Sequence, residues 1–486
     1  MTAIDTRIAG ELPVRAAADV AEEIGDDDTL AVSGFGSVGN PKAVPAALAE
    51  SATDRDRSLT VISGGSTGEP IDAQMVEAGA IARRYPYQGR AESRAAINDR
   101  EIAFHDLHIA RIGEQVEVGA LVDVDTAVVE AVAVEPGRFV PSTSIGHTPA
   151  YVAAADRVVV EVNESQPLAL AALHDVFRPG RPPDRDPIPL SSPGDRLGSP
   201  WIEFDRDKLV GVVRTNDPDT PYSFREPTDA DRQIASNFAA FVEAEMERNP
   251  ALAETIRLQF GVGSLGNALM GAIRSLDVGD RTIDYFGEVV QDGLLDLLAE
   301  DVLHDASATS LALSEEGQRR LFENVERYED AVVLRPASVS NRAELIDRFG
   351  VIAVNSAVEV DVFGNVNSTH VNGRRLLNGI GGSGDFNRNG LVSITALPST
   401  AAGGDISRVV PAVSHVDHTE HDVSVIVTER GVADLRGLSP SERAEAIVES
   451  CAHPDYRGRL REYLEHASDG PGHVPHDPTV AYDWMD

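Results

Sequence analysis

Short apolar runs rich in β-branched residues alternate along this chain with longer stretches whose apolar residues recur at helical spacing. The order strand, turn, helix, strand is predicted once in each half of the chain. Its parts are "TLAVS", "AVPAALAESA" and "SLTVIS" in the N-terminal half, and "IRLQF", "ALMGAIRSL" and "RTIDYF" in the C-terminal half. Strands that alternate with helices predict parallel sheets covered by helices. We therefore expect an α/β fold of two similar open domains with mainly parallel sheets.

The same glycine turn follows the first strand in each half. It reads "GFGSVGN" at residues 34–40 and "GVGSLGN" at residues 261–267. The spacing G-x-G-x-x-G between a strand and a helix is typical of dinucleotide-binding turns, so a nicotinamide cofactor is the first interpretation. The repeated turn also indicates an internal duplication, and "ADRVVVEVNES" is echoed in the same way by "HDVSVIVTERG".

The segment "RTNDPDTPYSFREPTDADRQ", residues 214–233, is rich in Asp and Pro and has no apolar period. Such a segment is the best place for a domain boundary. We therefore divide the chain near residue 228 into an N-terminal domain, 1–228, and a C-terminal domain, 229–486. Ligands of open α/β sheets lie beyond the carboxyl ends of the strands, so the two domains predict an active site in the cleft between them.

The charge of the chain narrows the choice of partners. The 486 residues include 42 basic and 79 acidic ones, which gives a formal net charge of -37. Such a surface repels nucleic acid and anionic membranes, so we expect neither as a partner. The acids are spread along the chain, and only Lys42 and Lys208 are lysines. A dense carboxylate surface stays hydrated in concentrated salt, so we hypothesise a halophilic protein.

The sequence shows no pattern typical of a targeting signal, and it has too few cysteines for a disulfide or a cysteine zinc site. No apolar run approaches membrane-spanning length, and the N-terminus lacks a basic-then-apolar signal pattern, so we expect a soluble cytoplasmic protein. The single cysteine, Cys451, can form neither an intrachain disulfide nor a cysteine zinc cluster. We interpret Cys451 as a small buried hydrophobic residue.

Glu288 is notable because it comes just after the strand "RTIDYF". It directly precedes an apolar pattern of helical spacing made by Val289, Val290, Leu294, Leu297 and Leu298. We expect its carboxylate to meet the positive end of a helix and to stay ionised. On spacing alone, the simpler interpretation is an acid that complements the helix dipole. Long polar and glycine-rich loops in the same half favour a functional role. These loops cover residues 339–344, 354–373, 378–389 and 411–440.

The motifs of these loops resemble those of the acetyl-CoA hydrolase/transferase family of class I CoA-transferases. "GEVVQDG", "NVNSTH", "NGIGGSGDF", "VSHVDHTEHDV" and "TERGVADLRG" occur in the family's order, and "GFGSVGNPK" and "GAIARRYPYQ" look like family segments. The resemblance implies an enzyme that transfers CoA between a short-chain acyl-CoA, such as acetyl-CoA or succinyl-CoA, and a carboxylate. Acyl-CoA is then a substrate, and no cofactor is permanently bound. Hydrolysis of acetyl-CoA by the same glutamate is the alternative, and we expect a homodimer.

The resemblance also implies roles for individual residues. Glu288 matches the family's nucleophile, which becomes a glutamyl-CoA thioester. Asn341 and the backbone N–H of Gly382 match the donors to the oxyanion, and Glu429 matches an acid near the acyl group. The family's CoA-contacting positions correspond to Gly261, Val262, Gly263, Ser264, Leu265, Gly266 and Asn267, together with Gly381 and Gly382. On this interpretation the second glycine turn approaches CoA, not a nicotinamide dinucleotide.

Two positions need separate interpretation. Many members of the family that this chain resembles have a lysine, which faces the CoA phosphates, where this chain has Ala402. Two alternatives follow: the contact is missing here, or Arg408 or another arginine supplies it. Lys42 is kept in "GNPK" although the chain is nearly free of lysine. A specific role and a solvated surface role for Lys42 are equally open.

Two rival functions fit parts of the sequence. A nicotinamide-dependent oxidoreductase would explain both glycine turns, with Asp284 as the ribose-binding acid. A metal enzyme is suggested by His415, His418 and His421, which lie three positions apart. That spacing matches neither the zincin pattern nor a cysteine-assisted site, so we expect no metal.

Overall fold

The computed structural model describes residues 4–469 and 471–483, and these residues form two compact units. The first unit contains the chain up to Ser223, together with Tyr285–Leu298 and His304–Leu345. The second contains Phe224–Asp284, Ala299–Leu303 and the chain from Ile346 onward. Among the described helices, none combines the length and the apolar character that crossing a membrane would require.

A nine-stranded sheet forms the base of the first unit. Its strands are β1 (Thr29–Val32), β2 (Leu59–Ile62), β3 (Ile81–Tyr85), β4 (Ala103–Phe104), β5 (Thr126–Glu135), β6 (Arg138–Pro141), β7 (Arg157–Asn163), β8 (Ile202–Glu203) and β9 (Leu209–Thr215). Their order is β4-β3-β2-β1-β5-β6-β8, while β7 pairs with both β5 and β9. All pairs are parallel except those that β6 makes with β5 and β8.

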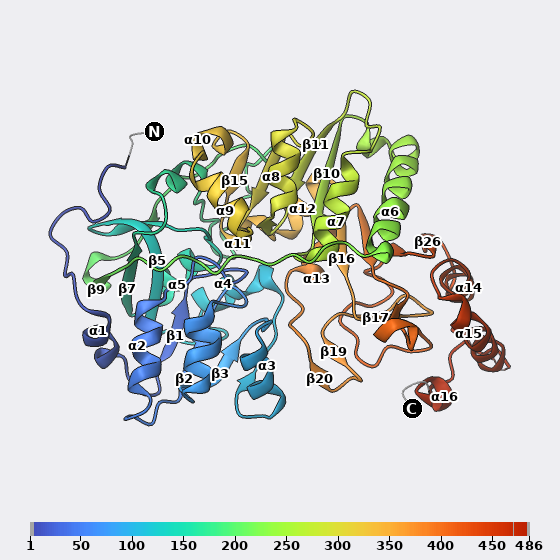
Figure 1. Cartoon of the computed structure of the whole chain (residues 1–486), viewed down its shortest axis with the longest axis horizontal. Coiled ribbons are helices and arrows are strands. Elements are labelled where there is room, and N and C mark those ends of the chain that lie inside the picture. Colours follow the sequence, from blue (N-terminus) through green and yellow to red (C-terminus); the bar gives the residue numbers. More distant parts are fainter. Residues whose placement is uncertain (1–3, 470, 484–486) are drawn as a thin grey trace. The chain divides into compact units, whose positions relative to one another are not determined.

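Helices cover this sheet because their apolar residues recur on one side. The helical elements of this region are α1 (Ala17–Glu23), α2 (Ala43–Ser51), η1 (Pro70–Met75), α3 (Ala91–Asn98), α4 (Ile109–Glu117), α5 (Thr148–Ala154), η2 (Leu168–Leu173) and η3 (Arg206–Lys208). Val44 and Leu48 of α2 lie four positions apart and are fully buried in one cluster with Leu30 of β1 and Val61 of β2. Figure 1 shows α2 beside these strands in the blue part of the chain.

Part of the C-terminal half of the chain belongs to the first unit. Its elements, most or all of whose residues belong to that unit, are β12 (Val289–Val290), α8 (Asp292–Ala299), β13 (Asp305–Ala308), β14 (Ser310–Leu311), α9 (Glu315–Phe322), α10 (Val325–Tyr328), β15 (Val332–Leu334) and α11 (Ala337–Ser340). Backbone hydrogen bonds join this part to the N-terminal segment of the same unit. The N–H of Ile145 donates to the carbonyl of Thr309 at 2.9 Å, and the N–H of Leu311 donates to the carbonyl of Thr143 at 3.1 Å.

The second unit is also an α/β structure. The elements that lie mainly or wholly in it are α6 (Asp229–Arg248), η4 (Pro250–Leu252), β10 (Thr255–Phe260), α7 (Ser264–Ile273), β11 (Thr282–Phe286), α12 (Ala343–Phe349), β16 (Ile352–Ser356), β17 (Glu359–Asp361), β18 (Val366–Asn367), β19 (His370–Val371), β20 (Arg375–Leu376), α13 (Ser383–Asn389), β21 (Val392–Ala396), β22 (Thr400–Ala401), η5 (Ala402–Gly404), β23 (Ile406–Ser407), β24 (Val409–Val410), β25 (Val425–Thr428), β26 (Gly431–Asp434), α14 (Pro440–Ser450), α15 (Pro454–Ala467) and α16 (Pro478–Ala481). The strands β10-β16-β21-β25 pair in parallel, and β26 closes this run with an antiparallel pair. Ile447 of α14 and Leu460 of α15 are buried in one cluster with Ile426 of β25.

The predicted α/β class with mainly parallel sheets is confirmed. Both glycine turns lie between a strand and a helix, as expected, the first between β1 and α2 and the second between β10 and α7. The domain boundary at residue 228 stays a prediction. The chain passes from the first unit to the second after Ser223, and two later segments belong to the first unit. Glu288 and Asn341 are therefore parts of the first unit.

Candidate active site

The backbone of Glu288 lies in a bend between β11 and β12 and is held by main-chain hydrogen bonds. Its carbonyl oxygen accepts from the N–H of Thr309 at 2.8 Å and from the N–H of Ser310 at 3.2 Å. The preceding residue has to be glycine, because a Cβ added to Gly287 would lie 2.4 Å from the phenol oxygen of the buried Tyr285. The half-buried side chain of Glu288 thus extends from a well-supported backbone.

The start of the next helix differs from the prediction. Val289 and Val290 form β12, which pairs in parallel with β14, whereas the sequence pattern places them in a helix. Helix α8 begins only at Asp292, which is the acid in its first turn. The prediction that Glu288 meets the positive end of a helix is therefore wrong. The β-branched side chains of Val289 and Val290 favour extended backbone, and a partner strand distant in sequence completes the pairing.

The side chain of Asn341 contacts Glu288 directly. Asn341 is fully buried after the last residue of α11, and its Nδ2 donates to Oε1 of Glu288 at 2.8 Å. The hydroxyl of Ser340 donates to Oδ1 of Asn341 at 3.0 Å, which orients the amide with its NH2 group toward the carboxylate. The residues predicted as nucleophile and oxyanion donor are thus brought together although 53 positions separate them.

The first glycine turn lies beside the segment that carries Glu288. A Cβ added to Gly36 would lie 3.7 Å from Oγ of Ser310, whose N–H donates to the carbonyl of Glu288. The carbonyl of Gly36 accepts a hydrogen bond from the phenol of Tyr222 at 2.5 Å. The turn therefore lies next to the segment that supports the backbone of the candidate nucleophile.

Carboxylates of the chain itself occupy the groups of this turn that would bind a phosphate. The N–H of Gly39 donates to the two carboxylate oxygens of Asp219 at 3.2 and 3.1 Å. At the start of α2, the N–H groups of Ala43 and Val44 donate to Glu161 at 2.8 and 3.2 Å. A dinucleotide would need such N–H groups for its pyrophosphate. The dinucleotide interpretation of the first turn is therefore wrong.

The second glycine turn has a different local structure. Helix α7 begins after Gly263, whose φ is 138°. A Cβ added to Gly266 would lie 2.2 Å from the carbonyl oxygen of Gly261, so glycine is required for the close packing of helix and strand. Asp284, the acid of the nicotinamide alternative, lies within β11 with its carboxylate 3.7 Å from the guanidinium of Arg257. It is paired with a residue of the neighbouring β10 and does not lie beyond a strand end.

Gly382 lies directly before α13 in the second unit. Gly381 has a φ of 61° and turns the chain toward this helix. The hydroxyl of Ser383 donates to the carbonyl of Ile380 at 2.8 Å and lies 3.0 Å from Nε2 of the buried His418. His418 thereby supports the loop that carries Gly382.

The other histidines considered for a metal site have different surroundings. His415 lies 3.4 Å from a carboxylate oxygen of Asp417, and the exposed His421 lies 3.5 Å from a carboxylate oxygen of Glu420. Among the described residues, His415, His418 and His421 belong to no group of His, Cys, Asp or Glu side chains that lie close enough together to hold a metal ion. The regular spacing of these histidines in sequence is thus not reproduced as a cluster in space.

Glu429 follows β25, and Ser399 and Arg430 hold its carboxylate. Ser399 donates to its carboxylate both from the backbone N–H, at 2.7 Å, and from the hydroxyl. Burial by itself would raise the pKa of Glu429, but these hydrogen bonds and the nearby Arg430 hold that pKa below its usual range. Glu429 therefore carries a negative charge at neutral pH.

Arg408 does not take the place of the missing lysine. Its Nε donates to the carbonyl of Val358 at 2.6 Å, and its Nη2 donates to the carbonyl of Ala357. Burial lowers the pKa of Arg408. Ala402 is exposed at a φ of 51°. The suggestion that Arg408 contacts the CoA phosphates is therefore wrong, because its guanidinium is committed to neighbouring backbone.

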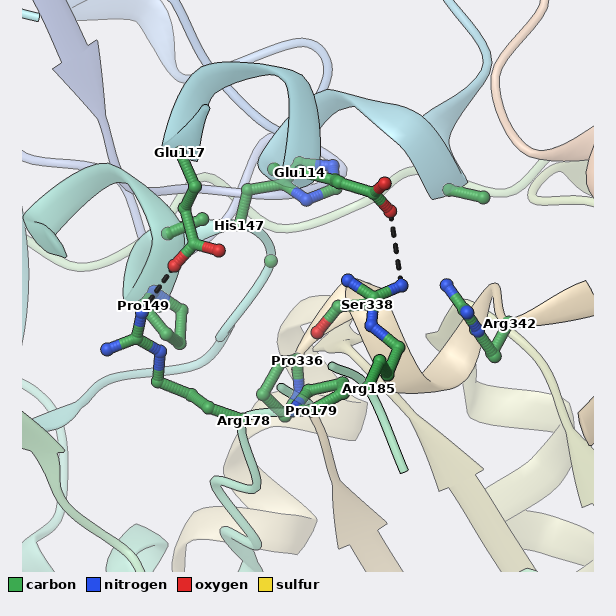
Figure 2. A pocket seen from close by; sticks show the side chains of 14 residues that line it. Glu114, Glu117, His147, Pro149, Arg178, Pro179, Arg185, Pro336, Ser338 and Arg342 are labelled. Carbon is green, nitrogen blue, oxygen red and sulfur yellow. Dashed lines mark hydrogen bonds and ion pairs between the residues drawn. The ribbon is translucent and has the colours of Figure 1, made fainter. Parts of the chain in front are cut away.

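A hollow in the first unit borders the helix that presents Asn341 (Figure 2). Ser338 of α11 and the following Arg342 line this hollow together with residues of α4 and of the segments 146–150 and 178–185. The carboxylate of Glu114 lies 3.2 Å from the guanidinium of Arg185, and Glu117 pairs with Arg178. These ion pairs tie α4 to the 178–185 segment beside α11.

Three residues near the site were not singled out by the sequence argument. Asp219 and Tyr222 lie in the polar segment that we took as a domain boundary, yet Asp219 is only 2% exposed. Burial raises the pKa of Tyr87, and the negative charge of Glu288 adds to that shift, so Tyr87 lies within electrostatic reach of the carboxylate. A single buried acid cannot be distinguished within an Asp-rich run, because its hydrogen-bond donors are distant in sequence.

The chain matches a known family over most of its length. Residues 12–214 match the acetyl-CoA hydrolase/transferase N-terminal domain, and residues 317–464 match the C-terminal domain of the same family. A succinyl-CoA:acetate CoA-transferase of Clostridium kluyveri is 42% identical over 96% of this chain and 87% of its own. A propanoyl-CoA:succinate CoA transferase of Escherichia coli is 40% identical over 96% and 95% of the two chains. An acetyl-CoA hydrolase of Saccharomyces cerevisiae is 37% identical over 90% and 86%.

Solved structures with lower identity show the same fold. RipA from Yersinia pestis superposes with a TM-score of 0.73 at 23% identity and covers 93% of this chain and 97% of its own. A 4-hydroxybutyrate CoA-transferase from Porphyromonas gingivalis gives a TM-score of 0.63 at 21% identity, with the same coverage of 93% and 97%. On the domain matches and the sequence identities, the chain belongs to the acetyl-CoA hydrolase/transferase family.

Proposed function

We propose that this enzyme transfers CoA between a short-chain acyl-CoA, acetyl-CoA or succinyl-CoA, and a carboxylate, through a glutamyl-CoA thioester on Glu288. The observation that carries the proposal is the 2.8 Å hydrogen bond from the Asn341 amide to the Glu288 carboxylate. It supports a role for the amide as the donor to the oxygen that bears charge when the carboxyl carbon of Glu288 is attacked. The succinyl-CoA and acetate of one relative's name support the substrate class.

The reaction divides one exchange into covalent steps. The carboxylate of Glu288 attacks the thioester carbonyl of acyl-CoA, which releases CoA thiolate and leaves a mixed anhydride on Glu288. The thiolate then attacks the glutamyl carbonyl and displaces the first carboxylate, so that CoA is bound to Glu288 as a thioester. A second carboxylate attacks this thioester and the same steps run in reverse, which releases the new acyl-CoA and restores Glu288.

Asn341 acts where the thiolate attacks the glutamyl carbonyl. The carbonyl oxygen of Glu288 becomes negatively charged in that tetrahedral state, and the Asn341 amide already contacts a carboxylate oxygen of this group. A fixed donor of this kind stabilises charge that develops in the transition state. Since Ser340 orients the amide before the reaction, little reorganisation is required.

The family resemblance supports further assignments for residues of the second unit. We assign donation to the oxyanion on the substrate carbonyl to the backbone N–H of Gly382, and a place near the acyl group to Glu429. We assign CoA contacts to the turn at 261–267 and to Gly381 and Gly382. A Cβ added to Gly263 of this turn would meet nothing within 4 Å, which supports a main chain that a ligand can approach closely.

Hydrolysis of acetyl-CoA is the second candidate, because acetyl-CoA hydrolases are among the relatives of similar identity. Water would resolve the covalent intermediate in place of a carboxylate. The two activities are separated by measuring CoA exchange and free thiol release with a panel of short carboxylates. Thiol release that outpaces exchange with every carboxylate would favour the hydrolase.

Acyl-CoA supplied without an acceptor is expected to leave CoA covalently bound to the protein. Intact mass followed by peptide mapping should place the adduct on the peptide that contains Glu288, and a Glu288→Ala control should form none. Cys451 is fully buried, and burial raises the pKa of its thiol to about 12, so it stays protonated at neutral pH. Reproducible labelling of Cys451 instead would indicate a thiol mechanism and refute the proposal.

The acidic surface leads to a separate expectation about salt. At a net charge of -37, raising KCl from about 0.1 M to about 1 M should increase both the melting temperature and the exchange rate. The reason is that screening over about 3 Å instead of about 10 Å removes most of the self-repulsion. Sucrose, which does not screen charge, is the control. Maximal stability and activity in dilute buffer would contradict the halophilic hypothesis.

The homodimer and the cytoplasmic location also stay predictions.

A further inference from the structure

Lys42 is buried and surrounded by carboxylates. Its side chain is 8% exposed, and its Nζ donates to Glu130, to Asp219 at 2.8 Å and to the carbonyl of Asn40 at 2.8 Å. Burial alone would lower the pKa of Lys42, but the charges of Asp219 and Glu130 raise it above its usual value. Lys42 is therefore an internal cation, and the interpretation of it as a solvated surface residue is wrong.

Each carboxylate near Lys42 also binds another part of the first unit. Glu130 of β5 accepts from the hydroxyl of Ser142 at 2.6 Å and from the amide of Asn163 at 2.9 Å. Asp219 accepts from the N–H of Gly39 and from the hydroxyl of Thr143. The cation thus joins the first glycine turn, β5 and the segments 142–146 and 217–222.

A third carboxylate, Glu161 of β7, lies on the backbone side of the same residue. It accepts from the N–H groups of Lys42 and Ala43. Glu130, Asp219 and Glu161 are the titratable groups that face Lys42 from the elements packed against it. A single lysine thus faces these three carboxylates.

The segment 142–146 connects this cluster with Glu288. A Cβ added to Gly39 would lie 2.3 Å from Oγ of Ser144, so the glycine turn and this segment are in direct contact. The carbonyl of Thr143 accepts from Leu311, and the N–H of Ile145 donates to Thr309. The N–H of Thr309 in turn donates to the carbonyl of Glu288. Hydrogen bonds therefore lead from the partner of Lys42 to the backbone of Glu288.

We propose that Lys42, through Asp219 and Thr143, is a positioning residue that holds the backbone of Glu288 in the place its attack on acyl-CoA requires. The inference rests on the proposed role of Glu288 as the nucleophile. Lys42 itself takes no part in bond making. Its effect is on geometry, and a misplacement of about 1 Å can cost roughly a hundredfold in a positioned reaction.

Lys42→Met tests this role, because methionine keeps the length of the side chain and removes its charge. The rate of CoA adduct formation on Glu288 should fall roughly 100-fold, while acyl-CoA still binds and the protein still unfolds cooperatively. Lys208→Met is the matched control. Lys208 donates to the carbonyls of Ala153 and Ala155 at 3.2 and 2.6 Å, so this variant should form the adduct at the wild-type rate.

The dependence on pH distinguishes positioning by charge from a general packing defect. Burial and the charge of Asp219 together raise the pKa of Glu130 to about 7, even though Lys42 opposes the shift. Without Lys42 this pKa lies higher still, so the cluster is ordered when Glu130 is protonated and loosens as pH rises through the raised pKa. The ratio of the Lys42→Met rate to the wild-type rate should therefore fall with rising pH.

Thr143→Val provides a milder test that does not remove a buried charge. It deletes only the hydroxyl that donates to Asp219, and the adduct rate should fall about tenfold with unchanged acyl-CoA binding. Wild-type adduct rates in both folded variants, or in Thr143→Val where Lys42→Met does not fold, would overturn the inference. Absence of a Glu288 adduct in the wild-type protein would refute the proposed function, which is a distinguishable result.

Discussion

Glu288→Asp is expected to exchange CoA at least roughly 100-fold more slowly than the wild-type enzyme, and Glu288→Ala, which has no carboxylate to carry CoA, should show no exchange. Aspartate keeps the charge but withdraws the carboxylate by about 1.5 Å, one carbon–carbon bond. The main chain cannot follow, because Thr309 and Ser310 hold the carbonyl of Glu288. The carboxylate would also leave the Asn341 amide, which now lies at 2.8 Å.

The exchange rate should be measured together with the circular dichroism spectrum and acyl-CoA binding, both of which we expect to be retained. Glu164→Asp is the matched control, since Glu164 is half exposed and pairs with Arg214 at the surface. It should exchange CoA at the wild-type rate. An active Glu288→Asp enzyme, or a Glu288→Ala enzyme with wild-type exchange, would remove Glu288 from the chemistry.

Asn341→Ala is expected to lower turnover by about two to three powers of ten, while acyl-CoA still binds. A donor that contacts the oxyanion matters most in the transition state, so its loss reduces kcat more than it raises KM. The packing cost should be modest, because α11 is also held by the bond from the Ala337 N–H to the carbonyl of Gly146. The rate of adduct formation and its decay with a carboxylate are the quantities to measure.

Asn324→Ala is the control for this substitution. Its amide donates to the carbonyl of Arg320 at the surface of the same unit, so turnover should be unchanged. If Asn341→Ala lost binding and kept its turnover, Asn341 would be a substrate clamp and not an oxyanion donor.

Local sequence determined the elements whose information lies within a few neighbouring residues. The β-branched runs before residues 34 and 261, the glycine turns and the apolar spacing of the following helices predict β1, α2, β10 and α7. Motif resemblance singled out both Glu288 and Asn341, which the fold brings within hydrogen-bonding distance. The same local information was misleading at Val289 and Val290, which fit a helical pattern but form β12.

Tertiary structure alone decided which groups meet, because hydrogen-bond partners distant in sequence leave no local pattern. The first glycine turn has the spacing of a phosphate-binding turn, yet its Gly39 N–H is bound by Asp219, 180 positions away. The sequence does not distinguish Lys42 from an exposed lysine, and only the fold brings Glu130 and Asp219 next to it. Backbone pairing between residues 143–146 and 309–311 likewise draws Glu288 into the first unit, across the boundary that composition suggested. Burial makes these polar contacts obligatory, since an unpaired charge inside the fold would be costly, and burial exists only once the chain has folded.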